Sequence, residues 1–437
     1  MDEPEILSPL LSKPQIQKQL DQLERVVKEA ERRIDITVAS DPSVAKAIQC
    51  VERFLRKKRR VCYGGQAINA LLPESRRFYD PQTTVPDYDF FSPSMDEDVA
   101  ELIDDLEEDG FDDISKKLSM HEGTIKVYVN FIPVADCSEM NKEMFSILQK
   151  RAKSVDGILY CDPDFLRMMM YLELSRPRGE VSRWKKVFER LTLLNHEYPL
   201  DECSSEIEVS EIGTDDRRSI LELCVKRKSV MLGAEFIELL DKNKGRTHID
   251  TLAKRGGPII ILSANPENDS SDIKYILQNK SLKDGSIKVE SVKSLSDHMY
   301  NYVKVLRRGK PIAILFQEDS CHSYTLLKVD GGEMRVGTPD TFLHLYYGLM
   351  IFGNKEKAYF QTALDCLIRK LYHISERHRG NPTKFIPAFG IKCSGHQRGV
   401  AELLKLKAQR TEKKKTNVKK AKKTRRLGKI WNRRSHF

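Results

Sequence analysis

The segment VPDYDFFS (residues 85–92) constrains the fold more than any other part of the chain. In an extended strand, residues two apart face the same way, so Asp87 and Asp89 project together while Tyr88 turns to the opposite face. Two neighbouring carboxylates repel each other unless a cation lies between them. Mg²⁺ suits such oxygen ligands and completes its shell with water and substrate phosphates. An isolated Asp-x-Asp is often a turn or a helix cap, but the flanking apolar residues favour a strand end that binds Mg²⁺ or Mn²⁺.

A pair of glycines precedes this strand. Gly64 and Gly65 follow the short apolar segment RVCY and open the apolar run QAINALL, which is typical of a turn between a strand and a helix. Glycine leaves the backbone N–H groups and the positive end of the helix dipole open to phosphate oxygens. Gln66 follows the pair, and its amide could bond a phosphate or simply open the helix. Glycine pairs are common in turns, so only their combination with the Asp-x-Asp strand predicts a nucleotide site.

A third carboxylate is expected close to the strand or hairpin that TIKVYVNFIPVADC forms. Asp136 is the candidate, because Asp156, Asp162 and Asp164 fit turns or helix caps better. Three carboxylates can hold two Mg²⁺ ions, one that lowers the pKa of an attacking hydroxyl and one that holds the leaving pyrophosphate. The glycine pair, the Asp-x-Asp strand and the third acid together are typical of nucleotidyltransferases.

The order of the predicted elements indicates an α/β (α+β) fold with two units. Residues 1–60 are predicted to form an N-terminal helical region, with helices near 14–35 and 43–59, and residues 61–197 a catalytic domain with trailing helices. After a polar, acid-rich stretch, residues 217–390 form a second α/β region, in which the order helix, glycine pair, strand recurs at Gly256–Gly257. No Asp-x-Asp motif follows that pair, so a second copy of the fold would lack the metal site.

Four cations flank a break at RPRGE in the helical stretch 162–195, namely Arg176, Arg178, Arg183 and Lys185. They could neutralise a triphosphate or an RNA backbone, although cations on a solvated helix face are an equally good explanation. Of these, Arg183 and Lys185 are taken as candidate nucleotide-binding residues.

The net charge of +10 is concentrated in the C-terminal tail, residues 405–437. This segment contains 15 lysines and arginines and a single acid, Glu412, whereas the rest of the chain is slightly acidic. Such a segment cannot bury a core and is predicted to be a flexible arm that contacts nucleic acid. A solubility tail or a nuclear import signal is the alternative.

The remaining composition points to a soluble intracellular protein. No run approaches the ~20 apolar residues of a membrane span, and the N-terminus MDEPEILSPL lacks the pattern of a signal peptide. The nine cysteines are scattered without a CxxC pair, which fits a reducing compartment. Cys393 and His396 lack the second ligand pair that a structural zinc site needs.

The motifs GGQAIN and VPDYDFFS, and above all the long motif DPDFLRMMMYLELSRPRGEVSRWKKVFERLTLLN, resemble the poly(A) polymerase catalytic subunits of nucleocytoplasmic large DNA viruses. The giant-virus and asfarvirus-like branch is the most similar, and the poxvirus enzyme is more distant. The resemblance extends over most of residues 40–390. Its long third motif is specific, whereas the first two are shared by nucleotidyltransferases generally.

This resemblance implies a polymerase beta-like nucleotidyltransferase domain followed by a degenerate copy at 217–390. It implies template-independent addition of AMP from ATP to RNA 3′ ends, with Asp87, Asp89 and Asp136 as metal ligands and Gly64 and Gly65 as triphosphate contacts. A homodimer and a location in the virion and host cytoplasm are further implications. One departure is Gln66, where the general pattern has Ser, and it leaves the γ-phosphate contact open.

Two other functions remain open at this point. One is an enzyme with a different nucleotide or acceptor, such as a terminal uridylyltransferase, and the other is a non-catalytic RNA-binding subunit. The intact Asp-x-Asp motif argues against the non-catalytic subunit, and the basic tail argues against a small-molecule acceptor. Neither feature identifies the base of the nucleotide.

Overall fold

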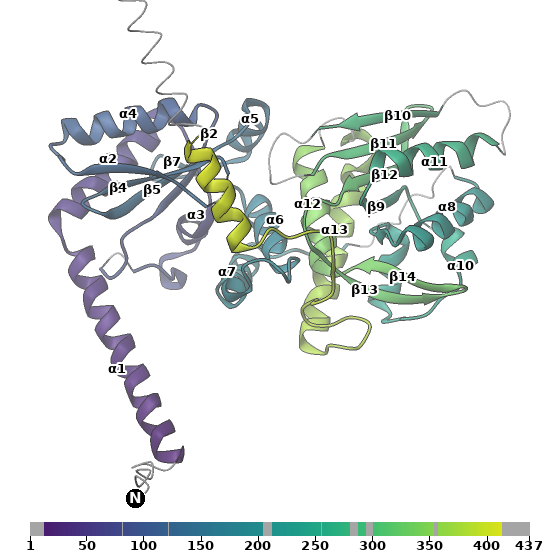
Figure 1. Ribbon diagram of the computed structural model, residues 1–437, viewed down its shortest axis with the longest axis horizontal. Helices are drawn as coiled ribbons and strands as arrows, with labels where there is room; N and C mark the ends of the chain where they lie inside the picture. The colour runs from purple at the N-terminus through teal and green to yellow at the C-terminus, as the bar shows by residue number, and fades with distance from the viewer. Residues whose placement is uncertain are drawn as a thin grey trace, which may run out of the picture.

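The computed structural model describes residues 13–80, 82–120, 122–203, 212–254, 256–279, 287–293, 300–353 and 357–412. Within them the chain forms two α/β lobes side by side, each around one mixed β-sheet (Figure 1). The fold class expected from the sequence is therefore confirmed. None of the helices described is both long and apolar enough to cross a lipid bilayer. Most of the basic tail lies outside the described residues, which end at residue 412.

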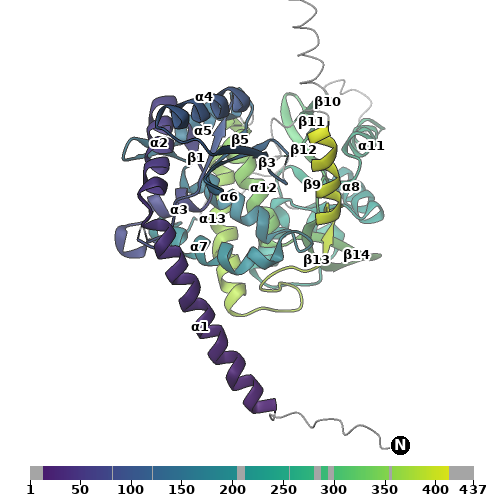
Figure 2. The same ribbon diagram turned by 60° about the vertical axis from the view of Figure 1, so that its left-hand side comes forward.

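Two helices precede the first sheet, close to the predicted ranges. α1 (Lys13–Ala39) projects away from the first lobe, and none of its residues is buried (Figures 1 and 2). α2 (Pro42–Lys58) begins after Asp41, whose side chain accepts a hydrogen bond from the N–H of Ser43 and so caps the helix. The apolar side of α2 is buried in the first lobe, where Phe54 is fully enclosed.

The first lobe contains a seven-stranded sheet in the order β3-β4-β5-β2-β1-β7-β6. The pairs β2–β5 and β1–β7 are parallel, and the other neighbours are antiparallel. Helices α2 and α4 pack on one face of this sheet. The elements are β1 (Val61–Cys62), α3 (Gly64–Leu71), η1 (Glu74–Arg76), β2 (Tyr88–Ser92), α4 (Met95–Glu108), β3 (Ile114–Leu118), β4 (Thr124–Val129), β5 (Ile132–Glu139), α5 (Lys142–Arg151), β6 (Lys153–Val155), β7 (Ile158–Tyr160), α6 (Pro163–Leu174), η2 (Val181–Arg183) and α7 (Trp184–Glu197).

The second lobe contains an eight-stranded sheet in the order β10-β11-β12-β9-β8-β14-β13-β15. Its elements are α8 (Thr214–Arg227), β8 (Val230–Met231), η3 (Ala234–Phe236), α9 (Ile237–Asp241), α10 (Ile249–Ala253), β9 (Ile259–Ser263), α11 (Pro266–Asn279), β10 (Ile287–Val292), β11 (Tyr302–Arg307), β12 (Lys310–Gln317), β13 (His322–Val329), β14 (Gly332–Gly337), α12 (Pro339–Phe352), α13 (Lys357–Gly380) and β15 (Cys393–Ser394). An unlabelled C-terminal helix follows at residues 400–412 and crosses back to the first lobe (Figure 1, yellow).

Seven strands of the second sheet repeat the first sheet in order and direction. β10 to β12 correspond to β3 to β5, and β9, β8, β14 and β13 correspond to β2, β1, β7 and β6. The register shift between Val127 and Tyr128 in β4 recurs between Val305 and Leu306 in β11. Such agreement of order, direction and bulge position identifies the second lobe as a second copy of the first fold.

Side chains confirm this alignment of the two copies. In the first lobe, Ser92 at the end of β2 donates to Asp98 of α4 at 2.5 Å, and Asp98 pairs with Arg60. In the second lobe the serine and the aspartate recur at the same positions, because Ser263 at the end of β9 donates to Asp269 of α11 at 2.5 Å; Asp269 also pairs with an arginine, Arg227 at the end of α8, although this residue lies three positions before β8 and not directly before it.

The copies differ where the first lobe carries its acids. The strand registers place Ile260 at the position of Asp89 and Ile314 at the position of Asp136. The second copy is therefore degenerate at the positions that would bind a metal. The register also corrects an expectation from the sequence, because Gly64 corresponds to Gly233, two residues after β8, and not to Gly256–Gly257.

A buried ion pair fills the corresponding space of the second lobe. The carboxylate of Glu235 lies against Gly233, as the carboxylate of Asp89 lies against Gly64. Arg217 of α8 pairs with Glu235 at 2.9 Å, and both residues are almost completely buried. A buried charge is stable in a protein only when it is paired. The second lobe thus replaces an acidic site with an internal salt bridge.

Four of the nine cysteines form two disulfides, Cys203–Cys366 and Cys321–Cys393. The five others are buried thiols. The scattered spacing of the cysteines did not indicate these pairs, because the partners are 163 and 72 residues apart in the sequence and meet only in the folded chain. Cys393 is joined to Cys321 through the pairing of β15 with β13, so it is not a zinc ligand with His396.

Candidate active site

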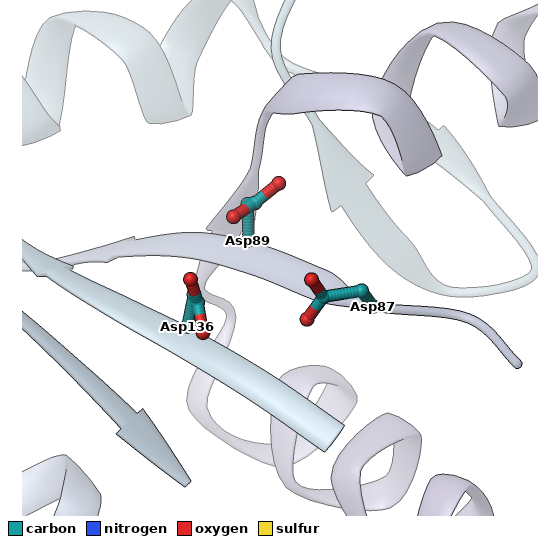
Figure 3. A group of neighbouring side chains, drawn as sticks. All are labelled: Asp87, Asp89 and Asp136. Carbon is teal, nitrogen blue, oxygen red and sulfur yellow. The ribbon is translucent and has the colours of Figure 1, made fainter. Parts of the chain in front are cut away.

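Three carboxylates converge at one edge of the first sheet. Asp87 lies directly before β2, Asp89 within β2, and Asp136 within the neighbouring strand β5, where it is the Cα partner of Asp89. One oxygen from each carboxylate lies within 4.8 Å of the others, and the side chains surround a common space (Figure 3). The structure therefore brings together the three acids selected from the sequence. Asp136 is in the middle of β5 rather than after a strand, because β5 continues to Glu139.

Burial and the neighbouring carboxylates raise the pKa values of Asp87 and Asp89. Burial, together with the charges of Asp87 and Asp136, raises the pKa of Asp89 to about 7. Partial desolvation and the charge of Asp136 raise the pKa of Asp87 to about 6, although that side chain is at the exposed rim of the group. Asp136 is buried and accepts a short hydrogen bond from Lys126 through Oδ2.

These residues fit a divalent metal. All donors are carboxylate oxygens, the set that Mg²⁺ and Mn²⁺ prefer. The Oδ1 atom of Asp136 is buried and has no hydrogen-bond partner among the described residues, so one lone pair of the group is left for a ligand. Asp87, Asp89 and Asp136 are therefore the residues that would hold such an ion.

Metal affinity at this site should depend on pH. A proton and a metal ion compete for the same carboxylate, and the pKa of Asp89 is about 7 while that of Asp87 is about 6. We expect Mn²⁺ binding, measured by titration calorimetry, to weaken progressively as the pH falls from 8 to 5. Asp112→Asn, an exposed substitution outside the group, should leave this profile unchanged. A constant affinity over that range would show that these carboxylates do not bind the ion.

Gly64 and Gly65 open α3 beside the three acids. Gly64 has a φ of +73°, a backbone conformation that only glycine adopts without strain, and a Cβ there would overlap the Asp89 carboxylate. A Cβ on Gly65 would lie 2.5 Å from the Tyr79 hydroxyl and 2.7 Å from an Arg190 guanidinium nitrogen. The start of α3 thus lies between the Arg190 guanidinium and the acidic group, and the first N–H groups of a helix have no acceptor within that helix, an arrangement that suits a metal-bound phosphate.

Gln66 lies in the first turn of α3, and its side chain is partly exposed. It makes no side-chain hydrogen bond to any residue that the structure describes. The amide is therefore available to a ligand, but the structure assigns it no contact.

Helix α7 contributes the cations, although not the pair expected from the sequence. Arg183 ends η2, directly before α7, and its charge acts on Asp89, but it also pairs with Glu173 and Glu180, both at 3.3 Å. Lys185 is exposed and makes no ion pair within the described part of the chain. Nothing in its surroundings connects Lys185 with the acids or with α3.

Two cations that sequence reasoning missed lie on the same face of α7 as Arg183. Lys186 and Arg190 follow it by three and seven residues, the spacing of one helical face, while Lys185 is turned away from that face. Burial and the charges of Arg190 and Arg183 lower the pKa of Lys186. This helical spacing was the signal in the sequence that could have separated Lys186 and Arg190 from Lys185.

Arg190 is held over the glycine turn by aromatic residues. Its guanidinium donates to the Tyr79 hydroxyl at 2.5 Å and lies 4.7 Å from the centroid of the Phe78 ring. The side chain of Asn69 fixes this loop, because its Oδ1 accepts hydrogen bonds from the N–H groups of Phe78 and Tyr79 at 2.9 and 3.0 Å. No described carboxylate pairs with Arg190, so its charge remains available for an anion at the start of α3.

Comparison with known proteins agrees with this geometry. The family model described as poly(A) polymerase catalytic subunit matches residues 49–180, which include the glycine pair and all three acids. The candidate poly(A) polymerase catalytic subunit of African swine fever virus (isolate Pig/Kenya/KEN-50/1950) is 32% identical over 168 residues, 37% of this chain and 35% of the relative. The corresponding Acanthamoeba polyphaga mimivirus protein is 26% identical over 198 residues, 44% of this chain and 33% of the relative.

The match to a solved structure is more extensive. The crystal structure of the Megavirus polyadenylate synthase superposes with a TM-score of 0.75 at 19% identity and covers 95% of this chain and 86% of that chain. At this identity the match demonstrates a shared fold, which extends over both lobes. The part of the chain that matches the curated relatives spans about a third of their length. The resemblance seen in the sequence is confirmed at residues 49–180, which match the model of the poly(A) polymerase catalytic subunit family.

Proposed function

We propose that this protein is a template-independent polynucleotide adenylyltransferase, which adds AMP from ATP to RNA 3′ ends by a two-metal mechanism. The observation that carries the proposal is the group Asp87, Asp89 and Asp136 next to the open glycine turn, within the family domain. mRNA is the proposed acceptor, and the virion and host cytoplasm are the proposed locations.

The reaction would join the RNA 3′ oxygen to the α-phosphorus of ATP. The bond between that phosphorus and the oxygen bridging to the β-phosphate breaks, pyrophosphate leaves, and the hydroxyl proton passes to solvent. Mg²⁺ or Mn²⁺ ions held by the three carboxylates would lower the pKa of the hydroxyl and stabilise charge on the leaving pyrophosphate. The N–H groups at the start of α3 and the guanidinium of Arg190 would orient the triphosphate.

The test is extension of a labelled short RNA with Mg²⁺ or Mn²⁺ and each nucleoside triphosphate in a separate reaction. We expect long products with ATP alone on a denaturing gel. Extension with UTP instead would support a terminal uridylyltransferase, and extension with all four would support an unselective nucleotidyltransferase. No extension with any nucleotide would leave a non-catalytic RNA-binding subunit as the better description.

We further propose that the protein forms a homodimer through α1. Apolar side chains on this helix recur at alternating intervals of three and four residues, which is the heptad spacing of a coiled coil. They remain exposed in the single chain, with Leu20 at 52% and Leu23 at 56%. The members of this stripe are Ile16, Leu20, Leu23, Val27, Ala30 and Ile34.

Charged substitutions in the stripe should separate the dimer. We expect the double variant Leu20→Glu, Leu23→Glu to sediment as a monomer in analytical ultracentrifugation, because each buried leucine of a coiled coil contributes about 2 kcal/mol. Arg25→Glu, on the opposite side of α1, is the matched control and should retain the dimer. If the double variant sediments like the natural chain, α1 does not form the interface.

A further inference from the structure

A row of four side chains crosses the first sheet. The Cα pairing places Asp89 beside Asp136, Asp136 beside Lys126, and Lys126 beside Lys117, on β2, β5, β4 and β3 respectively. Paired residues on neighbouring strands point to the same face, so all four lie on the face opposite α2 and α4. With strands ~4.8 Å apart, the row continues ~10 Å beyond Asp136 to the edge strand.

The outer half of this row is cationic and lacks an acid of its own. Lys126 pairs with Asp136, whereas no carboxylate of the described residues lies within ion-pair distance of Lys117. The Lys117 ammonium group instead lies 4.8 Å from the centroid of the partly exposed Tyr128 ring. Two lysines on directly opposed positions of neighbouring strands destabilise a sheet. Because Asp136 compensates Lys126, Lys117 is the cation of this row that an anionic ligand could still neutralise.

The second lobe provides an internal comparison for this row. The same register positions there hold Ile260, Ile314, Lys304 and Glu290. Glu290 stands where the first lobe has Lys117, and it pairs with Lys304 at 3.5 Å. Both rows are neutral in sum, but the charges pair differently: in the second lobe Lys304 has Glu290 as its partner, whereas in the first lobe Asp136 pairs with Lys126 and Lys117 is left without a carboxylate among the described residues. Lys117 therefore has no acid of its own in this row, which leaves its charge available to a ligand.

The position of the glycine turn indicates which of the two substrates would contact Lys117. Gly64 and Gly65 follow β1, on the far side of β2 from β4 and β3, so the triphosphate would reach the acids from the β1 side. The acceptor must then approach from the side of β4 and β3. We propose that Lys117 and Tyr128 bind the RNA primer next to its 3′ end, with Lys117 on a backbone phosphate and Tyr128 stacked on a base. This inference rests on the proposed function.

The C-terminal helix adds further cations at the same edge. Arg410 donates a hydrogen bond at 3.0 Å to the carbonyl of Met120, which lies between β3 and β4. The helix also carries Lys405 and Lys407, so the described start of the basic tail is beside the edge strand that carries Lys117. The contact extends the cationic surface from Lys117 to the basic segment that was predicted to bind nucleic acid.

The experiment compares Lys117→Glu, which introduces the residue type of the second lobe, with Lys116→Glu. Lys116 is the adjacent exposed lysine of β3, and its side chain points to the opposite face. Binding of a fluorescent single-stranded RNA to the full chain is measured by anisotropy without nucleotide over a range of salt concentrations. We expect Lys117→Glu to weaken RNA binding about tenfold. The slope of the logarithm of the affinity against the logarithm of the salt concentration should fall by about one, which corresponds to one released counterion. Tyr128→Ala should weaken binding about fivefold, and Lys116→Glu should match the natural chain.

The outcome separates this inference from the proposed function. Equal RNA binding by Lys117→Glu and Lys116→Glu would overturn the inference even if the natural chain makes poly(A). Weaker RNA binding by Lys117→Glu than by Lys116→Glu would support the inference even if the nucleotide proves to be other than ATP. In steady-state extension assays, a higher KM for RNA with an unchanged KM for the nucleotide would identify Lys117 as a primer contact. A higher KM for the nucleotide would place it in the triphosphate site and overturn the inference.

Discussion

Replacing Asp89 with asparagine will abolish nucleotide incorporation and will also stabilise the metal-free protein at pH 8. Asp89 would be a ligand of the metal, and the loss of several kcal/mol of charge stabilisation lowers the rate by about 10³-fold or more. The stability effect has the opposite direction because the folded protein holds this carboxylate next to two others in a partly buried position.

The sign of the stability effect follows from the pKa values. The pKa of Asp89 is about 7 in the folded protein and near the ordinary value of 3.8 in the unfolded chain. The ionised carboxylate therefore destabilises the fold increasingly as the pH rises from about 4, and this penalty is complete above about pH 7. Asparagine carries no charge, so the variant should melt a few degrees higher than the natural chain at pH 8 in EDTA, with a much smaller difference at pH 4.

Thermal melts with and without metal test both parts of the prediction. Mg²⁺ or Mn²⁺ should raise the melting temperature of the natural chain, since it binds the folded form, and should have little effect on Asp89→Asn. Asp112→Asn is the control for a loss of charge at an exposed site. Undiminished incorporation by Asp89→Asn would remove Asp89 from the metal site. A lower melting temperature at pH 8 would mean that its charge is compensated in the fold.

Local periodicity was sufficient to predict the part of the site that lies on one strand. Asp87 and Asp89 share a face because side chains alternate along β2, and this depends only on residues 85–92. Asp136 was selected because its strand follows in the same unit, but its place directly beside Asp89 depends on the parallel pairing of β2 with β5. The register of strands that are distant in the sequence is set by packing of the whole sheet, which a single sequence does not reveal.

The expectations that the structure corrected also concern contacts between segments that are distant in the sequence. Gly256–Gly257 resembled the glycine turn in its local sequence, but the register shows Gly233 at the position of Gly64. Both disulfides join residues that meet only through tertiary structure. The cluster of Tyr79 and Arg190 at Gly65 joins a loop and a helix separated by 111 positions in the chain. Each of these features depends on contacts between segments and not on the pattern within one.

Arg190→Ala should lower kcat/KM for ATP about 30-fold, mainly through a higher KM. A hydrogen-bonded charge of this kind contributes about 2 kcal/mol to the binding of a phosphate, which corresponds to that factor. Arg190 lies at the free N–H groups of α3, is held by Tyr79 and the Phe78 ring, and has no described carboxylate as a partner. Arg190→Lys should recover only part of the activity, because an ammonium group does not reproduce the planar two-point contact of a guanidinium.

The matched control is Lys185→Ala, which removes a cation from the same helix on a face turned away from the acids. Its kcat/KM for ATP should remain within about twofold of the natural value, which corresponds to less than ~0.5 kcal/mol. Binding of ATP in the absence of RNA, measured by calorimetry, separates a triphosphate contact from an effect on the primer. If Lys185→Ala weakens ATP binding more than Arg190→Ala does, the triphosphate lies on the other side of α7. The reason for placing the RNA primer along the row from Asp89 to Lys117 would then be lost, because that placement assumes that the triphosphate approaches from the β1 side. The comparison therefore also tests on which side of the acids each substrate binds.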